Sequence, residues 1–124
     1  FVDFTFLTSV FTHMLPDDLA HYLGELRRVL KPGGRCLITF FLLNEESLGL
    51  IRDGKSTQKF VHTLDGCTTT DPVTPEDAIA YKEERVKELF AQNGMRIVEP
   101  IRYGSWCGRK EFLSYQDMVI ATKL

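Results

Sequence analysis

Hydrophobic and polar positions divide the chain into periodic segments and one aperiodic stretch. Residues 1–8 and 35–43 are nearly continuous apolar runs, which predicts two strands that are buried on both faces. Between them, residues 16–30 place apolar side chains at the spacing of one helical face, and Pro16 suits the first helical position. We therefore expect a strand, a helix and a second, parallel strand.

The segment KPGG, residues 31–34, joins the expected helix to the second strand. Pro32 disfavours helical geometry at Lys31, and a glycine can take the left-handed conformation that closes a helix. A phosphate-binding loop needs the opposite order, with the glycines between a strand and a helix. We interpret KPGG as a helix stop and not as a ligand site.

Residues 44–74 are polar and have no sustained period, which is typical of a lid or a binding insertion. The following helix is expected to begin at Pro75, with Thr74 as its cap, and to end at Asn93 and Gly94. Its buried face is predicted to carry Val86, Leu89 and Phe90.

The chain ends in two predicted strands, residues 95–103 and 117–124, which are joined by a long turn. Because no helix lies between them, they are expected to pair antiparallel. The predicted fold class is α/β, a sheet of parallel strands that ends in an antiparallel hairpin.

Composition excludes several classes of function. With 44% apolar and 26% charged residues and a net charge of −2, the chain has no broad attraction for nucleic acid or an anionic membrane. The longest apolar run is too short to span a bilayer, and the three cysteines match no zinc spacing. We expect reduced thiols, a cytoplasmic location, a small-molecule partner and no metal, nucleic acid or membrane.

Residues 1–41, FVDFTFLTSVFTHMLPDDLAHYLGELRRVLKPGGRCLITFF, resemble the second half of a class I S-adenosylmethionine-dependent methyltransferase (a type 11/25-like domain). They correspond to its fourth strand, the following helix, the LKPGG turn and its fifth strand, and the final hairpin matches its last two strands. The resemblance implies a Rossmann-like methyltransferase sheet and S-adenosyl-L-methionine as the cofactor.

The resemblance is partial. The family holds most of its cofactor with a glycine-rich loop after its first strand and an acidic residue after its second, and neither occurs in these 124 residues. We interpret residues 1–124 as the carboxyl-terminal half of a single methyltransferase domain with an insertion at about 44–74. Its amino-terminal half is missing from this fragment, and the chain alone is expected to be inactive.

Ligands in open α/β sheets lie beyond the carboxyl ends of the strands, which singles out the loop after the first strand. The resemblance implies that Thr8, Ser9 and Val10 contact the cofactor and that His13 lies beside its methionine portion. His13 is also the candidate catalytic base for an acceptor that must lose a proton. The alternative is an ordinary loop in which His13 is a polar lead into the helix.

Acceptor binding is expected from aromatic side chains in or beside the irregular segments, because they form an apolar wall with a polar edge. The candidates are Phe11, Phe41, Tyr81, Tyr103 and Trp106. In the turn YGSWCGR, Gly104 and Gly108 allow a close backbone approach around Trp106. The alternative is that these aromatic residues cover the sheet as part of its core.

The predicted function is S-adenosylmethionine-dependent methyl transfer to a small-molecule acceptor, such as a hydroxyl of a sugar or a secondary metabolite. One alternative is a non-catalytic half-fold that binds a protein partner through the exposed edge of its first strand. Another is a fragment of a nicotinamide-dependent oxidoreductase, a class that rarely ends in the antiparallel pair expected here.

Overall fold

The computed structural model describes residues 2–124, so the first residue of the predicted first strand, Phe1, lies outside the described residues. Its elements in chain order are β1 (Val2–Leu7), η1 (Phe11–His13), α1 (Pro16–Val29), β2 (Leu30–Phe40), β3 (Leu42–Leu43), α2 (Glu45–Arg52), β4 (His62–Leu64), β5 (Cys67–Thr69), η2 (Pro75–Asp77), β6 (Ile79–Lys82), α3 (Glu83–Gln92), β7 (Met95–Arg102) and β8 (Asp117–Lys123). Within residues 2–124, no helix is both long and apolar enough to cross a membrane.

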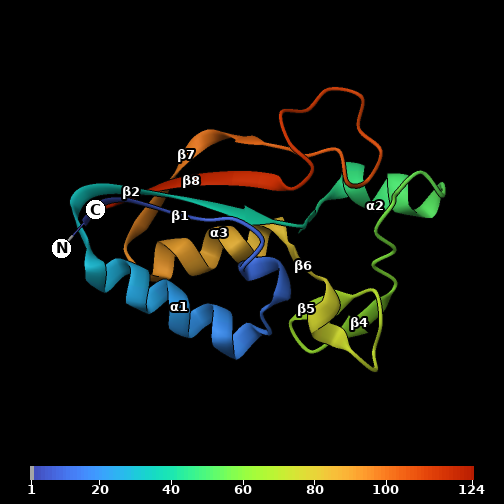
Figure 1. Ribbon diagram of the computed structural model, residues 1–124, viewed down its shortest axis with the longest axis horizontal. Coiled ribbons are helices and arrows are strands. Elements are labelled where there is room, and N and C mark those ends of the chain that lie inside the picture. Colours follow the sequence, from blue (N-terminus) through green and yellow to red (C-terminus); the bar gives the residue numbers. More distant parts are fainter. Residues whose placement is uncertain (1) are drawn as a thin grey trace.

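The main sheet has the strand order β1-β2-β8-β7 (Figure 1). Strands β1 and β2 are parallel, whereas β8 pairs antiparallel with both β2 and β7. Helices α1 and α3 lie along the same side of this sheet. The predicted parallel pair and terminal antiparallel hairpin are therefore confirmed.

Helix α1 follows the sequence pattern closely. Pro16 occupies the first turn of α1. Two acidic residues in the first turn and two basic residues in the last turn interact favourably with the helix dipole: Asp17, Asp18, Arg27 and Arg28. Leu19, Leu23 and Leu26 are buried against the sheet. Burial of each such leucine is worth about 1.5–3 kcal/mol, so this one face is enough to dock the helix.

Helix α1 stops directly before KPGG, as expected, but the segment is part of strand β2 and does not supply the glycine cap that we expected. Helix α1 ends at Val29, and the backbone is already extended at Leu30. Val2 pairs with Leu30 but Phe4 pairs with Arg35, so residues 31–34 bulge out of the β1–β2 ladder.

The two glycines make this bulge possible. Gly33 has a φ of +80°, and a Cβ on Gly34 would lie 2.8 Å from the carbonyl oxygen of Lys31. KPGG therefore joins a helix to a sheet, as the order of elements indicated, but through a bulge.

The expected structureless insertion contains a helix and a hairpin. Asn44 and Ser47 form a reciprocal capping box at the start of α2. Strands β4 and β5 form a hairpin within a second sheet of order β3-β6-β5-β4. Each of these strands has two to four residues, too few for a recognisable hydrophobic period.

The helix predicted from Pro75 begins later than expected. Residues Pro75–Asp77 form a single 3-10 turn, strand β6 follows, and α3 begins at Glu83. Strand β6 is buried between β3 and β5, so tertiary pairing overrides the helix-start signal. The buried face of α3 and its end beside Asn93 are as predicted.

The main sheet has one covered face and one open face. The covered face carries buried side chains such as Cys36, Ile38 and Val119, which pack in one cluster with α1 and α3. On the other face, Phe4 is 52% exposed and Phe6 is 67% exposed. The register places the half-buried Leu37, Met118 and Ile120 on this same face. Strand β1 is therefore not buried on both faces as predicted, because within residues 2–124 no layer covers its second face.

Candidate functional site

The turn after β1 is tied to the ends of two neighbouring strands. Ser9 has a φ of +59°, which is uncommon for a residue other than glycine. Its backbone N–H donates to Oγ1 of Thr39, 2.8 Å away, and its hydroxyl accepts from the Gln116 side chain at 3.0 Å. Such strained conformations cost on the order of 1–3 kcal/mol and cluster at ligand sites, so this turn is a candidate site.

The predicted cofactor residues in this turn are accessible to different extents. Thr8 and Ser9 are exposed, whereas Val10 is half-buried and packs against the main core. Just beyond them, the Oγ1 atom of Thr12 is buried without a hydrogen-bond partner among the described residues.

His13 is exposed, and a hydrogen bond determines its tautomer. Its Nδ1 lies 2.8 Å from the carbonyl oxygen of Glu76. Because a carbonyl oxygen can only accept, Nδ1 carries the hydrogen, and in the neutral imidazole Nε2 keeps its lone pair. The imidazole is therefore oriented with its basic nitrogen available.

Four of the five predicted acceptor residues are buried. Phe11 packs edge-on against Tyr22 and Phe40 in the main core. The Tyr81 hydroxyl donates to the carbonyl of Met14, and burial raises the pKa of Tyr81. Phe11 and Tyr81 are therefore core residues, which was the alternative interpretation of these aromatic side chains.

Phe41 and Trp106 belong to an aromatic cluster with Phe60. The three rings pack at centroid distances of 5.2–5.4 Å, mostly edge to face. Trp106 is completely buried. Neither Phe41 nor Trp106 offers an acceptor an open surface in this conformation, and only Tyr103 among the five lines a cleft.

A buried carboxylate that the sequence analysis missed lies beside this cluster. Asp117, the first residue of β8, accepts hydrogen bonds from the backbone N–H groups of Leu42 and Gly104, each at 2.7 Å. Its other partners are the Trp106 indole at 3.0 Å and the Arg109 guanidinium at 3.3 Å. Burial raises the pKa of Asp117 even though these donors oppose the shift. The only signal in the sequence is an acidic residue directly before an apolar run.

We expected a close backbone approach at Gly104 and Gly108. Other backbone segments of this chain make that approach. A Cβ on Gly104 would collide with the carbonyl oxygens of Tyr115 and Gln116. Gly108 has a φ of +105°, and a Cβ there would lie 2.7 Å from the carbonyl oxygen of Lys55. The glycines thus let residues 103–116 fold back on themselves and pack against the segment after α2.

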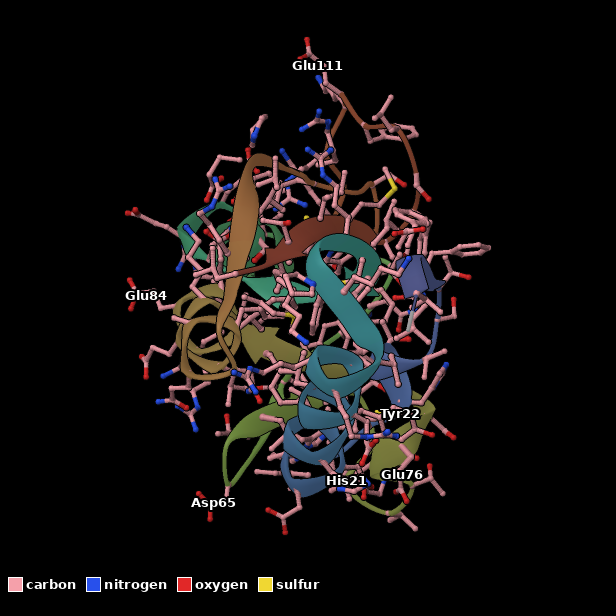
Figure 2. All side chains as sticks on the ribbon, turned by 90° about the vertical axis from the view of Figure 1, so that its left-hand side faces the viewer. His21, Tyr22, Asp65, Glu76, Glu84 and Glu111 are labelled. Carbon is pink, nitrogen blue, oxygen red and sulfur yellow. The ribbon has the colours of Figure 1, made fainter. Side chains whose placement is uncertain are left out.

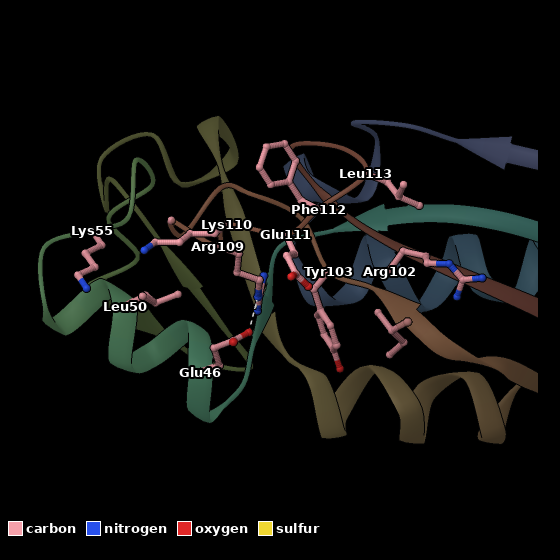
Figure 3. A pocket seen from close by; sticks show the side chains of 12 residues that line it. Glu46, Leu50, Lys55, Arg102, Tyr103, Arg109, Lys110, Glu111, Phe112 and Leu113 are labelled. Carbon is pink, nitrogen blue, oxygen red and sulfur yellow. Dashed lines mark hydrogen bonds and ion pairs between the residues drawn. The ribbon is translucent and has the colours of Figure 1, made fainter.

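A cleft of about 790 Å³ lies between α2, the end of β7 and residues 103–116 (Figure 3). It is lined both by the segment that we interpreted as a lid or binding insertion and by the YGSWCGR turn. Its lining residues are Glu46, Leu50, Lys55, Ile101, Arg102, Tyr103, Gly108, Arg109, Lys110, Glu111, Phe112 and Leu113.

Tyr103 and Arg109 form the ordered part of the cleft wall. The guanidinium of Arg109 stacks over the Tyr103 ring, 4.8 Å from its centroid. Arg109 also pairs with Glu46 and Asp117. Burial opposes the charge on Arg109, but the hydrogen bond to Glu46 and the charge of Asp117 outweigh it and raise the pKa.

The Tyr103 hydroxyl extends this network to α3. It donates to Oε1 of Glu83 at 2.6 Å, and Asn44 donates to the same oxygen at 3.1 Å. Burial would raise the pKa of Glu83, yet these hydrogen bonds and Lys87 lower it. The ring of Tyr103 is therefore held in place along one wall of the cleft.

Comparisons with known proteins agree with the fold described above. A family model described as a methyltransferase domain matches residues 1–38. A SAM-dependent methyltransferase from Methanosarcina mazei has a TM-score of 0.63 and 24% identity, with 98% of this chain and 59% of that chain covered. Human N-acetylserotonin methyltransferase in complex with SAM has a TM-score of 0.62 and 18% identity, with 98% and 29% covered. The resemblance to class I methyltransferases and the predicted fold class are thereby confirmed.

The same comparisons set a limit on what the fold implies. The chain spans 59% of the first of these structures and less than a third of the second. A third similar structure, described as a pericyclic reaction enzyme, has a TM-score of 0.58 and 10% identity over 98% of this chain and 26% of that one. One fold therefore serves more than one reaction, and the activity has to be argued from the site.

Proposed function

We propose that this chain is the carboxyl-terminal half of an S-adenosylmethionine-dependent methyltransferase that acts on a small-molecule acceptor, for example a hydroxyl of a sugar or a secondary metabolite. The order β1-β2-β8-β7, a parallel pair followed by an antiparallel hairpin, carries this proposal. Its support is the match of residues 1–38 to the methyltransferase family and the likeness of almost the whole chain to SAM-dependent enzymes.

We place one edge of the cofactor beside the turn after β1. Thr8 and Ser9 are exposed, Ser9 holds a strained conformation, and the Thr12 hydroxyl lacks a partner among the described residues. We assign cofactor binding to Thr8, Ser9, Val10 and His13. When it is bound, S-adenosyl-L-methionine supplies the methyl group from its sulfonium.

The open face and free edge of β1 support a missing amino-terminal half as the partner of this chain. Strand β1 lies at the edge of the main sheet, and its own Phe4 and Phe6 are exposed. A free apolar edge is an aggregation hazard unless another strand pairs with it. We assign the glycine-rich loop and the acidic residue of the cofactor site to that half.

His13 is the proposed catalytic base. Nε2 would take the proton of an acceptor hydroxyl, while the N–H at Nδ1 stays bonded to the Glu76 carbonyl. The remaining task of the protein is to hold the acceptor in line with the methyl group. We assign that task to the cleft beside Tyr103.

We also propose that the protein is cytoplasmic. Cys36, Cys67 and Cys107 are all buried and free. Unpaired cysteines are typical of reducing compartments, which supports the cytoplasm.

Titration calorimetry with S-adenosyl-L-methionine tests the proposal. This chain alone should bind weakly or not at all, and the complete protein should bind the cofactor and release S-adenosylhomocysteine during turnover. Micromolar binding by the chain alone would show that the cofactor contacts are placed wrongly. A complete protein that does not bind the cofactor would refute the methyltransferase assignment and favour the partner-binding half-fold.

The role of His13 is tested in the complete protein by His13→Ala. Loss of a general base should lower turnover by about a hundredfold or more, with little change in cofactor affinity. His21→Ala is the matched control, because His21 is exposed on α1 (Figure 2). Turnover that is unchanged across the pH range in His13→Ala would remove this residue from the mechanism.

A further inference from the structure

The cleft carries positive charge that the described residues do not neutralise. Lys55, Arg102 and Lys110 form no ion pair within residues 2–124. Glu111 also lines the cleft and offsets one of these three charges, so a positive excess remains. The whole chain has a net charge of −2, so this excess is local. Such a cleft attracts an anion.

The same cleft has an apolar wall. Phe112 is 54% exposed and Leu113 is 74% exposed, and both line the cleft together with Leu50 and the ring of Tyr103. Exposed apolar side chains beside a cleft are typical of a binding surface. An occupant with an apolar body would remove this surface from water.

Arg109, which lines the cleft, has one buried hydrogen-bond donor without an acceptor among the described residues. Its side chain is only 6% exposed, and Nη2 has no acceptor among the described residues, although the other nitrogens bond to Glu46, Gly104 and Asp117. An unpaired buried donor costs about 1–3 kcal/mol, more when it is charged. A carboxylate oxygen is an acceptor that matches a guanidinium.

We propose that the acceptor is an amphipathic anion, a small molecule with an aromatic body and a carboxylate. The positive side chains of the lining, Lys55, Arg102 and Lys110, attract the carboxylate. Phe112, Leu113 and Tyr103 cover the aromatic body. This inference rests on the proposed function because it takes the cleft to be the acceptor site.

A pair of probes that differ only in charge tests this inference. Affinities of 2-naphthoate and of the neutral 2-naphthamide for the complete protein are measured by calorimetry at pH 7.5. Naphthoate should bind about tenfold more tightly than the amide. The double variant R102A/K110A should lose about tenfold in naphthoate affinity, since two exposed charge contacts are removed, and it should bind the amide unchanged.

The double variant R52A/K59A is the matched control. It removes the same two charges from exposed positions outside the cleft lining. Naphthoate affinity should be unchanged in it, and in the wild type it should fall as salt is raised. Equal affinities for the two probes, or equal losses in both double variants, would overturn the inference.

Activity assays separate this inference from the proposed function. Methyl transfer only to uncharged acceptors would overturn the carboxylate inference and leave the methyltransferase assignment intact. Charge-selective naphthoate binding that is lost in R102A/K110A supports the anionic cleft, even if no methyl transfer is found and the proposed function fails.

Discussion

Two regions of this molecule are held together in different ways. The scaffold, made of the main sheet with α1 and α3, has a continuous apolar cluster built from helix faces and alternating strand positions. The cap, residues 42–82 and 103–116, has strands of two to four residues and a small cluster centred on aromatic rings. Short strands offer few ladder hydrogen bonds, so the cap depends more on side-chain contacts, including those of Leu42, Ile79 and Tyr81 with the scaffold cluster.

Asp117 is one of the contacts that join the two regions, besides the hydrogen bonds of Tyr81 to Met14 and of Tyr103 to Glu83. It begins a scaffold strand, yet its four hydrogen-bond partners, Leu42, Gly104, Trp106 and Arg109, belong to the cap. The comparison teaches that burial of periodic apolar residues builds the scaffold, whereas the cap also needs side-chain hydrogen bonds, of which those to the buried Asp117 are the most numerous. The predictions below test this division.

The largest effect is expected for Asp117→Ala. The change leaves the buried Arg109 without one of its two carboxylate partners and three further donors without an acceptor. Breaking a buried pair costs about 3–5 kcal/mol, so the free energy of unfolding, measured in urea, should fall by about 5 kcal/mol. Asp117→Asn should lose less because it keeps an acceptor oxygen.

Asp53→Ala is the control for that experiment, because Asp53 is exposed at the end of α2. Its unfolding free energy should stay within about 0.5 kcal/mol of the wild type. A loss below 1 kcal/mol in Asp117→Ala would contradict the central role given to this carboxylate.

The next effect is expected for Trp106→Ala. Removal of a fully buried tryptophan costs about 3–5 kcal/mol, and the same urea titration should show a loss of about 4 kcal/mol. Tyr115→Ala, at a 41% exposed ring that also packs on Phe41, should lose less.

This variant also decides between two interpretations of Trp106. The sequence analysis placed Trp106 in the acceptor wall, which predicts a higher KM for the acceptor with stability unchanged. If the complete protein shows that result, Trp106 faces the acceptor and the core assignment is wrong.

A smaller effect is expected from Cys36 at alkaline pH. Burial raises the pKa of Cys36 to about 11, from an ordinary value of 9.0. Because the folded state disfavours the thiolate, the stabilisation is complete below pH 9 and is lost as the pH rises through 11. At 1.36 kcal/mol for each unit of pKa, the loss is about 2–3 kcal/mol.

Urea unfolding of the wild type and of Cys36→Ala at several pH values between 8 and 11 measures this loss. Both proteins contain the other alkaline groups, so the difference between their pH profiles isolates Cys36. Parallel profiles would show that the thiol ionises equally well in the folded and unfolded states.

Much of the scaffold could be predicted from the sequence, because its signals are local. The spacing of Leu19, Leu23 and Leu26 predicts α1, and the apolar run after Asp117 predicts β8. The cap could not be predicted in the same way. The capping box of Asn44 and Ser47 was a readable signal for α2, but β6 forms only because β3 and β5 flank it.

In the candidate site too, features set by nearby residues could be predicted and features set by distant residues could not. The turn after β1 could be located because parallel strands direct their carboxyl ends toward a ligand site, and Ser9 and His13 follow such a strand. The tautomer of His13 depends on the Glu76 carbonyl, 63 residues away in the sequence, and could not be predicted.

The sequence by itself determined the order of strands and helices in the scaffold, since periodic burial and turn chemistry act over a few residues. Tertiary structure alone decided which aromatic residues face the cleft. Tyr103 and Trp106 lie three positions apart, yet Tyr103 lines the cleft and Trp106 is buried. The burial of Trp106 comes from Phe41, Phe60 and Asp117, which meet it only when the cap folds onto the end of the sheet. Contacts between such distant residues depend on the assembled fold, and no local pattern encodes them.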